Sequence, residues 1–162
     1  MEEKLNALYK EIAETVDNMI PVEWNKFYFY AQVSESGGGT YFFYSPISDP
    51  VKFEYSLKIP INYEINEKEF DAGKGKLLSL AEEMKSIFAE YEQDLWYSFT
   101  LSLERTGKLK VHFDYTNWFD TNYTFNNQMI IWKYKYLNEV PIIDKHKEII
   151  KKYLLEYPDN PI

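Results

Sequence analysis

The stretch that decides the fold is LWYSFTLSLERTGKLKVHFDY, residues 95–115. A short break, Arg105-Thr106-Gly107, places a glycine where a tight turn needs a positive φ. On both sides of this break every second side chain is apolar: Leu95, Tyr97, Phe99, Leu101, Leu103, Leu109, Val111, Phe113 and Tyr115. Successive side chains of a strand point to opposite faces, so the pattern predicts a β-hairpin with one apolar and one mostly polar face. Trp96 falls on the polar side. We expect the rest of the chain to extend this hairpin with strands and to cover its apolar face with helices.

The segments before the hairpin predict two helices. Apolar residues recur at spacings of three and four from Glu2 to Ile20, and Pro21 ends this pattern. Asn66 can cap a second helix that begins near Glu67 and carries acids in its first turn. Gly73 and Gly75 weaken the early turns of this helix, so fraying or a kink is expected there.

Three strands are expected between these helices. They are 24–33, 41–44 and 51–57, and Pro60 ends the third. Three consecutive glycines, 37–39, read as part of a loose hairpin loop over 34–39.

The C-terminal part predicts two further helices. Residues 129–137 suggest a short helix, although Ile131-Trp132 would also suit a strand, and residues 144–156 form the last helix. The resulting order is α-β-β-β-α-β-β-α-α, which predicts an α+β fold: a largely antiparallel five-stranded sheet with helices packed on one face. We expect one domain over residues 1–157 and a disordered tail over residues 158–162.

Composition restricts the classes of function. A formal charge of −8 argues against direct binding of nucleic acid and suits a basic protein partner, although plain solubility explains it as well. The chain contains no cysteine, which excludes disulfides, zinc-thiolate sites and cysteine nucleophiles. No signal peptide and no membrane-spanning run is visible, so a soluble, cytoplasmic protein is expected.

The sequence contains no compelling set of catalytic residues. His112 and Asp114 alternate on one strand face, where an acid–base pair could form, but a solvated surface histidine is the simpler interpretation. Asp114 and Asp120 flank Trp118 without the spacing of a calcium loop, and the glycines 37–39 lack the residues of a phosphate loop. We therefore expect no enzyme activity, no metal and no cofactor.

Two surfaces remain as candidates for protein binding. The first is an aromatic turn next to carboxylates, in which rings can anchor a partner and the acids can pair with its Arg or Lys: Asp114, Tyr115, Trp118, Phe119 and Asp120. Trp118 and Phe119 could equally plug the edge of the core. The second surface is acidic, since residues 61–94 hold nine acids against four lysines.

Three stretches together resemble the YezG-like antitoxin family, and the similarity covers nearly the whole chain. They are Ile20-Pro21-Val22-Glu23-Trp24-Asn25-Lys26 continuing through Tyr28, Tyr30 and Ala31 to Gly37-Gly38-Gly39; Leu95-Trp96 through Gly107-Lys108 to Phe113-Asp114-Tyr115 and Trp118; and Ile130-Ile131-Trp132-Lys133-Tyr134-Lys135-Tyr136-Leu137.

The resemblance implies an immunity protein. Such a protein stays in the cytoplasm of a bacterium that exports a nuclease toxin through a type VII secretion system, and it binds and neutralises the nuclease domain. The basic nuclease domain would be the partner, with no direct contact to nucleic acid or membrane. Two alternatives stay open: a toxin-specific secretion chaperone, and an enzyme that depends on a metal or on His112 and Asp114. Residues 71–76 and 121–128 depart from the family's pattern and could tune the choice of partner.

Overall fold

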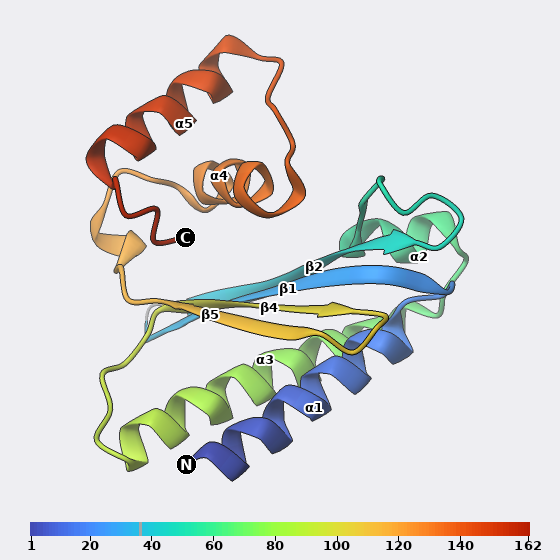
Figure 1. Ribbon diagram of the computed structural model, residues 1–162. Coiled ribbons are helices and arrows are strands. Elements are labelled where there is room, and N and C mark those ends of the chain that lie inside the picture. The colour runs from blue at the N-terminus through green and yellow to red at the C-terminus, as the bar shows by residue number, and fades with distance from the viewer. Residues whose placement is uncertain (36) are drawn as a thin grey trace. The chain divides into compact units, whose positions relative to one another are not determined.

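The computed structural model describes residues 1–35 and 37–162. The chain divides into two compact units, Met1–Phe113 and Asp114–Ile162 (Figure 1). The expectation of a single domain over residues 1–157 stays a prediction.

The first unit is built on the five-stranded sheet expected from the sequence. Its strands are β1 (Trp24–Ser34), β2 (Gly37–Pro46), β3 (Glu54–Tyr55), β4 (Ser98–Glu104) and β5 (Leu109–Asp114). They lie in the order β3-β2-β1-β4-β5, and β1 pairs antiparallel with both β2 and β4. The central hairpin is confirmed as β4 and β5, and Gly107 in its turn has a φ of 97°.

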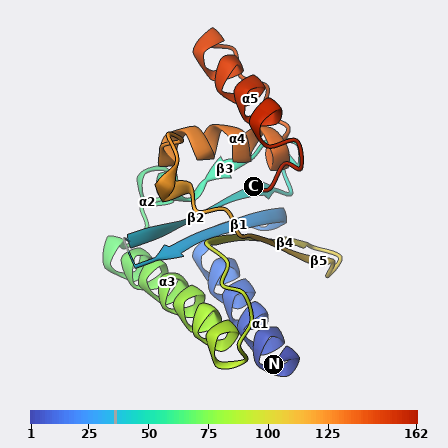
Figure 2. The ribbon, with the colours of Figure 1, turned by 90° about the vertical axis from the view of Figure 1, so that its left-hand side faces the viewer.

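Two long helices, α1 (Glu2–Met19) and α3 (Glu67–Glu90), cover one face of this sheet (Figures 1 and 2). Asn66 caps α3 as expected, because its Oδ1 accepts hydrogen bonds from the backbone N–H groups of Lys68 and Glu69 at 2.9 and 3.3 Å. The predicted fraying or kink at Gly73 and Gly75 is wrong, since α3 runs unbroken through both.

The core lies between the two helices and the sheet. Phe29 pairs in register with Leu101 of β4 and with Phe42 of β2, so apolar side chains of three strands share the face that the helices cover. Trp96 is fully buried in this core, against the rings of Phe88 and Phe113, and not on a polar face. The strand alternation mispredicted it because β4 begins only at Ser98, so Trp96 lies outside the strand.

The opposite face of the sheet is more aromatic than expected. Ser98, Thr100 and Ser102 of β4 are buried, and each is paired in register with a large side chain of β1: Gln32, Tyr30 and Tyr28. The rings of Tyr30 and Tyr41 stack on this face with centroids 4.9 Å apart. The expectation of a mostly polar, solvent-exposed face is therefore wrong for β4, whose small hydroxyl residues lie beside bulky neighbours. It is confirmed for Lys110 and His112 of β5, which are exposed.

The glycines 37–39 belong to β2 and not to a loop, because they pair with residues 32–34 of β1. A Cβ atom on Gly38 would come within 1.9 Å of the Gln32 carbonyl oxygen, so glycine permits the close approach of the two strands. The expected third strand, 51–57, is shortened to β3 and followed by a 3-10 turn, η1 (Ser56–Lys58), and a short helix, α2 (Ile59–Asn62). Pro60 lies in the first turn of α2, where its missing N–H costs nothing.

The second unit contains a 3-10 turn, η2 (Trp118–Asp120), and the helices α4 (Phe125–Leu137) and α5 (Asp144–Glu156). Helix α4 starts earlier than expected because Thr124 Oγ1 accepts a hydrogen bond from the N–H of Asn127 at 3.1 Å and caps it. Ile131 and Trp132 are helical, so the strand alternative is wrong. The bounds expected for α5 are confirmed.

The tail 158–162, for which we expected disorder, folds back on these helices. The N–H of Ile162 donates a hydrogen bond to Tyr153 Oη at 3.0 Å, and Lys135 Nζ donates to the carbonyl of Asn160 at 2.8 Å and to the oxygen of Ile162. Ile162 is only 5% exposed.

Candidate partner-binding site

The turn that begins the second unit is organised by the carboxylate of Asp114. Its Oδ1 accepts a hydrogen bond from the backbone N–H of Thr116 at 2.9 Å, and its Oδ2 accepts one from Trp118 Nε1 at 2.7 Å. Asp114 is 3% exposed and Trp118 is 1% exposed. These two predicted site residues are therefore buried. They stabilise the turn from inside and are not accessible to a partner.

Trp118 lies at the centre of an aromatic cluster. Its ring is 4.9 Å from the ring of Tyr157, 5.3 Å from that of Tyr123 and 6.0 Å from that of Tyr153. The sequence left open whether Trp118 and Phe119 plug the core, and the structure gives that role to Trp118 alone. The cluster joins the turn to α5.

The other predicted site residues lie at the surface of the turn. Tyr115 is 52% exposed and Phe119 is 44% exposed. The carboxylate of Asp120 accepts a hydrogen bond from Asn117 Nδ2 at 2.9 Å, while Asn117 Oδ1 accepts one from the N–H of Phe119 at 3.2 Å. Asn117 thus bonds to the backbone of Phe119 and to the side chain of Asp120, and exposed rings close to a carboxylate in the chain suit a protein contact.

Burial shapes the electrostatics beneath this turn. Burial lowers the pKa of Lys135, and the charge of Asp114 opposes that change. Burial also raises the pKa of Tyr153 and of Tyr123, and for Tyr123 a hydrogen bond to Glu156 at 2.9 Å adds to the effect. Lys135 donates to the carbonyl of Asn160 at 2.8 Å and Tyr153 donates to its Oδ1 at 2.7 Å, so the hydrogen-bond partners of these groups lie within the second unit.

The structure gives no further support to catalysis by His112 and Asp114 or to a metal site. Both carboxylate oxygens of Asp114 are engaged by structural donors, and His112 lies on the exposed part of β5. Within residues 1–35 and 37–162 no group of three or more His, Asp or Glu side chains could hold a metal ion. The same residues include no helix that is both long and apolar enough to cross a membrane.

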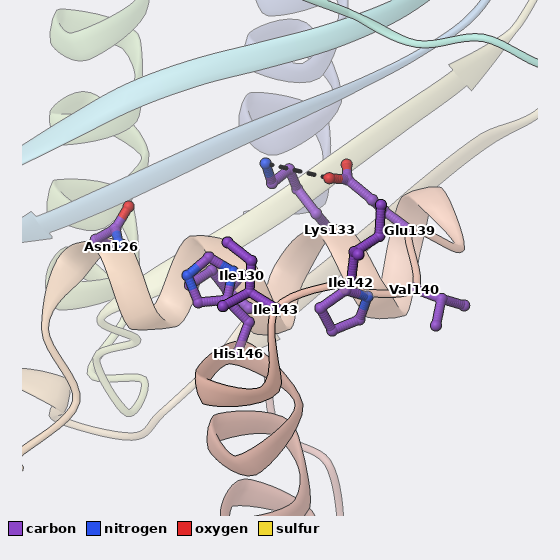
Figure 3. Close-up of a pocket in the computed structure, with 9 residues that line it drawn as sticks. Asn126, Ile130, Lys133, Glu139, Val140, Ile142, Ile143 and His146 are labelled. Carbon is purple, nitrogen blue, oxygen red and sulfur yellow. Dashed lines mark ion pairs between the residues drawn. The ribbon is translucent and has the colours of Figure 1, made fainter.

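Sequence reasoning missed an apolar groove between α4 and α5 (Figure 3). The groove has a volume of about 430 Å³, and Ile130, Ile142, Ile143 and His146 are among the residues that line it. A signal was present in the sequence, because the run Val140-Pro141-Ile142-Ile143 connects two helices where polar turn residues are usual.

The acidic charge is unequally divided between the units. The first unit carries 19 Asp and Glu against 12 Lys and Arg, whereas the second carries seven against six. The acidic surface expected from the sequence therefore belongs to the first unit, where α1 and α3 supply much of it.

The chain is similar to a known protein family and to several known proteins. The family described as "Immunity protein YezG-like" matches residues 5–151. "Type VII secretion system protein EsaG" of Staphylococcus aureus is 36% identical over 160 residues, which cover 96% of each chain. "Immunity protein YezG" of Bacillus subtilis is 30% identical over 148 residues, 91% of this chain and 97% of the relative, and its namesake in Bacillus spizizenii is 28% identical over 154 residues, 93% of each. Because the family match over residues 5–151 covers far more than half of the chain, the chain belongs to the YezG-like immunity protein family.

Proposed function

We propose that this protein is a cytoplasmic antitoxin that binds and neutralises the nuclease domain of a type VII-secreted toxin, without catalysis of its own. The observation that carries the proposal is the similarity to EsaG, which spans 96% of both chains and whose name places that relative in a type VII secretion system. Membership of an immunity protein family supports neutralisation as the role.

The distribution of charge supports a basic partner. A nuclease presents cationic side chains to the phosphates of its substrate. The first unit, with its excess of seven acidic charges, provides a negative field that would attract such a cleft and speed association.

The aromatic turn provides a second element of the proposal. Tyr115, Phe119 and Asp120 are the exposed members of the predicted site, so they would contact the toxin directly. Asp114 and Trp118 would hold them in place from beneath. Replacing Phe119 by Ala should then weaken binding by more than about tenfold, or about 1.4 kcal/mol.

The test is a titration of the nuclease domain encoded beside this gene. Stoichiometric antitoxin should abolish DNA cleavage, and calorimetry should show binding that weakens as salt is raised, because exposed charges are screened. Phe119→Ala should lose affinity while its urea unfolding stays unchanged. Absence of binding at micromolar concentration would refute the pairing with that toxin, and unchanged affinity of Phe119→Ala would remove the turn from the interface.

A second candidate function is a secretion chaperone for the toxin. It is favoured by the name of EsaG, which refers to a secretion system, whereas the Bacillus relatives are named immunity proteins. A deletion strain separates the two roles. Self-intoxication with normal export indicates an antitoxin, and loss of exported toxin without intoxication indicates a chaperone.

A further inference from the structure

The segment that follows α5 turns back towards α4 (Figure 1). Residues 157–162 read YPDNPI and are rich in turn-forming side chains. The backbone N–H of Asn160 donates a hydrogen bond to the carbonyl of Tyr157 at 2.9 Å, and Asn160 has a left-handed φ of 51°. Asparagine adopts that conformation more readily than most residues. The local sequence therefore specifies the reversal of the chain.

The returning tail, residues 158–162, binds both helices of the second unit. On α4, Lys135 Nζ donates to the carbonyl of Asn160 at 2.8 Å and to the oxygen of Ile162. Tyr136 Oη donates to the same oxygen of Ile162 at 3.3 Å. On α5, Tyr153 Oη donates to Asn160 Oδ1 at 2.7 Å and accepts a hydrogen bond from the N–H of Ile162 at 3.0 Å.

These hydrogen bonds lie where water has little access. Tyr153 is 1% exposed and Ile162 is 5% exposed, so the tail buries an apolar side chain beside its polar partners. Breaking such bonds is costly, because a desolvated donor or acceptor is left without a partner. The tail is therefore a packed part of the second unit.

Helix α5 has few other anchors. Of its 13 residues only Ile150 and Tyr153 are buried, and its N-cap residue, Ile143, makes no side-chain capping bond. A helix of this length is marginally stable in water and depends on tertiary contacts. The tail supplies contacts of that kind, and it does so through Tyr153.

Tyr153 also connects the tail to the aromatic turn. Its ring lies 6.0 Å from that of Trp118, and the ring of Tyr157, directly before the tail, lies 4.9 Å from Trp118. Burial lowers the pKa of Lys135, and the charge of Asp114 opposes that change, so this carboxylate acts on the lysine that holds the tail. The tail is thus linked to both buried residues that stabilise the turn.

We propose that residues 158–162 form a strap that orders the aromatic turn, and that Lys135 and Tyr153 hold this strap in place. Lys135 and Tyr153 are then positioning residues, which act on a partner only through the exposed side chains of the turn. The effect on toxin binding rests on the proposed function, whereas the coupling of the tail to the turn does not.

Two substitutions in the full chain release the strap through different bonds. Lys135→Met removes the ammonium group and keeps the aliphatic stem. Asn160→Gly removes the acceptor of Tyr153 Oη, while glycine still permits the left-handed φ. Lys151→Met is the matched control, because Lys151 is an exposed lysine of α5. Circular dichroism and urea unfolding verify that each variant is folded under the conditions of measurement.

Hydrogen exchange followed by NMR reports on the turn without any partner. The indole N–H of Trp118 and the backbone N–H of Thr116 both donate to Asp114, so their exchange is slow only while the turn is ordered. Both strap variants should exchange these two protons at least about tenfold faster than the wild type. The backbone N–H of Ile131 in α4 should change by less than about threefold, and Lys151→Met should match the wild type throughout.

Calorimetric titration of the nuclease domain encoded beside this gene measures the consequence for binding. Each strap variant should lose at least about fivefold in affinity, and the control should stay within about twofold. Adding Lys135→Met to Phe119→Ala should cause little further loss, because both changes act through the same turn. A fully additive loss would place Lys135 in direct contact with the toxin and overturn its positioning role.

The combined results separate the strap from the proposed function. If the wild type does not bind the nuclease but the strap variants speed exchange in the turn, the proposed function is refuted and the strap is supported. If the wild type binds and both strap variants exchange and bind as it does, only the strap is refuted. Equal acceleration at Ile131 would also overturn it, since the tail would then stabilise the whole unit. Lost affinity with unchanged exchange would do the same, because the tail would then contact the toxin itself.

Discussion

The hydrogen bond from Trp118 Nε1 to Asp114 Oδ2, 2.7 Å long, shows how one contact can organise a whole turn. It joins a buried indole to a buried carboxylate, and hydrogen bonds to charged groups in such places are among the stronger ones. The bond holds Asp114 in the interior, while the next residue, Tyr115, is exposed.

Replacing Trp118 by Phe should lower the free energy of unfolding by about 2 kcal/mol. The variant keeps most of the buried ring but removes the donor to a desolvated carboxylate. The measurement is urea unfolding followed by circular dichroism.

The control is Phe119→Leu, at a neighbouring residue that is 44% exposed, which should change stability by less than about 0.5 kcal/mol. Equal unfolding midpoints for Trp118→Phe and the wild type would show that the hydrogen bond contributes nothing to stability.

The turn around Trp118 also shows what a sequence can predict at the scale of single residues. The cluster of rings and acids around Trp118 was identified from residue types alone. Its division into buried and exposed members was not, because η2 turns the chain by about 120° per residue and sends neighbouring side chains in different directions. That path depends on the hydrogen bonds of Asp114 and Asn117, which have no periodic signature.

At the scale of elements, the contact between α1 and α3 explains why a helix with two glycines stays straight. A Cβ atom on Gly73 would come within 2.7 Å of Met19 Sδ, so this glycine lets α1 approach closely. Gly75 has no such neighbour within 4 Å. The sequence could predict the cost of both glycines but not the tertiary packing that outweighs it.

The two glycines therefore predict opposite behaviour. Gly75→Ala should raise the free energy of unfolding by up to about 1 kcal/mol, because alanine restricts the unfolded chain and favours the helix. Gly73→Ala should gain less or lose stability, because the Met19 side chain must move. Urea unfolding of the two variants measures the difference, and a larger gain for Gly73→Ala would contradict the packing seen here.

The elements differ in how well the sequence predicts them. Helices α1, α3 and α5 and the central hairpin follow from periodicity. By contrast, β3 is much shorter than its alternating pattern. On its C-terminal side the helical turns η1 and α2, the latter with Pro60 in its first turn, take the chain out of the sheet. The glycines of β2 look like a loop in sequence, and only pairing with β1 reveals them as a strand.

At the scale of the whole molecule, buried phenols set the response to alkali. Burial is the main cause that raises the pKa of Tyr44, Tyr123 and Tyr153 above the ordinary 10.0. The folded protein then keeps phenol protons that the unfolded chain releases, so stability falls as pH rises above 10. Burial lowers the pKa of Lys85 and Lys135 below 10.5. These two lysines therefore make stability rise with pH, but only up to about pH 10.5, above which they are neutral in the unfolded chain as well.

We therefore expect the urea midpoint to fall steeply once pH exceeds about 10.5, because the buried phenols and the two lysines with a raised pKa, Lys4 and Lys26, all contribute less stability there as pH rises. Tyrosinate absorbance, followed in parallel, should show a fraction of the 15 tyrosines that ionises only together with unfolding. Ionisation of every tyrosine near pH 10 in a chain that stays folded would contradict the burial described for Tyr44 and Tyr153.

The placement of the indoles has a practical consequence. All four tryptophans are at most 4% exposed, with Trp24 and Trp96 in the first unit and Trp118 and Trp132 in the second. Their fluorescence should be blue-shifted in the native state and move to longer wavelength when water reaches them. Chains that retain a single pair would give each half its own optical signal, so one could observe directly whether the halves melt together or in succession.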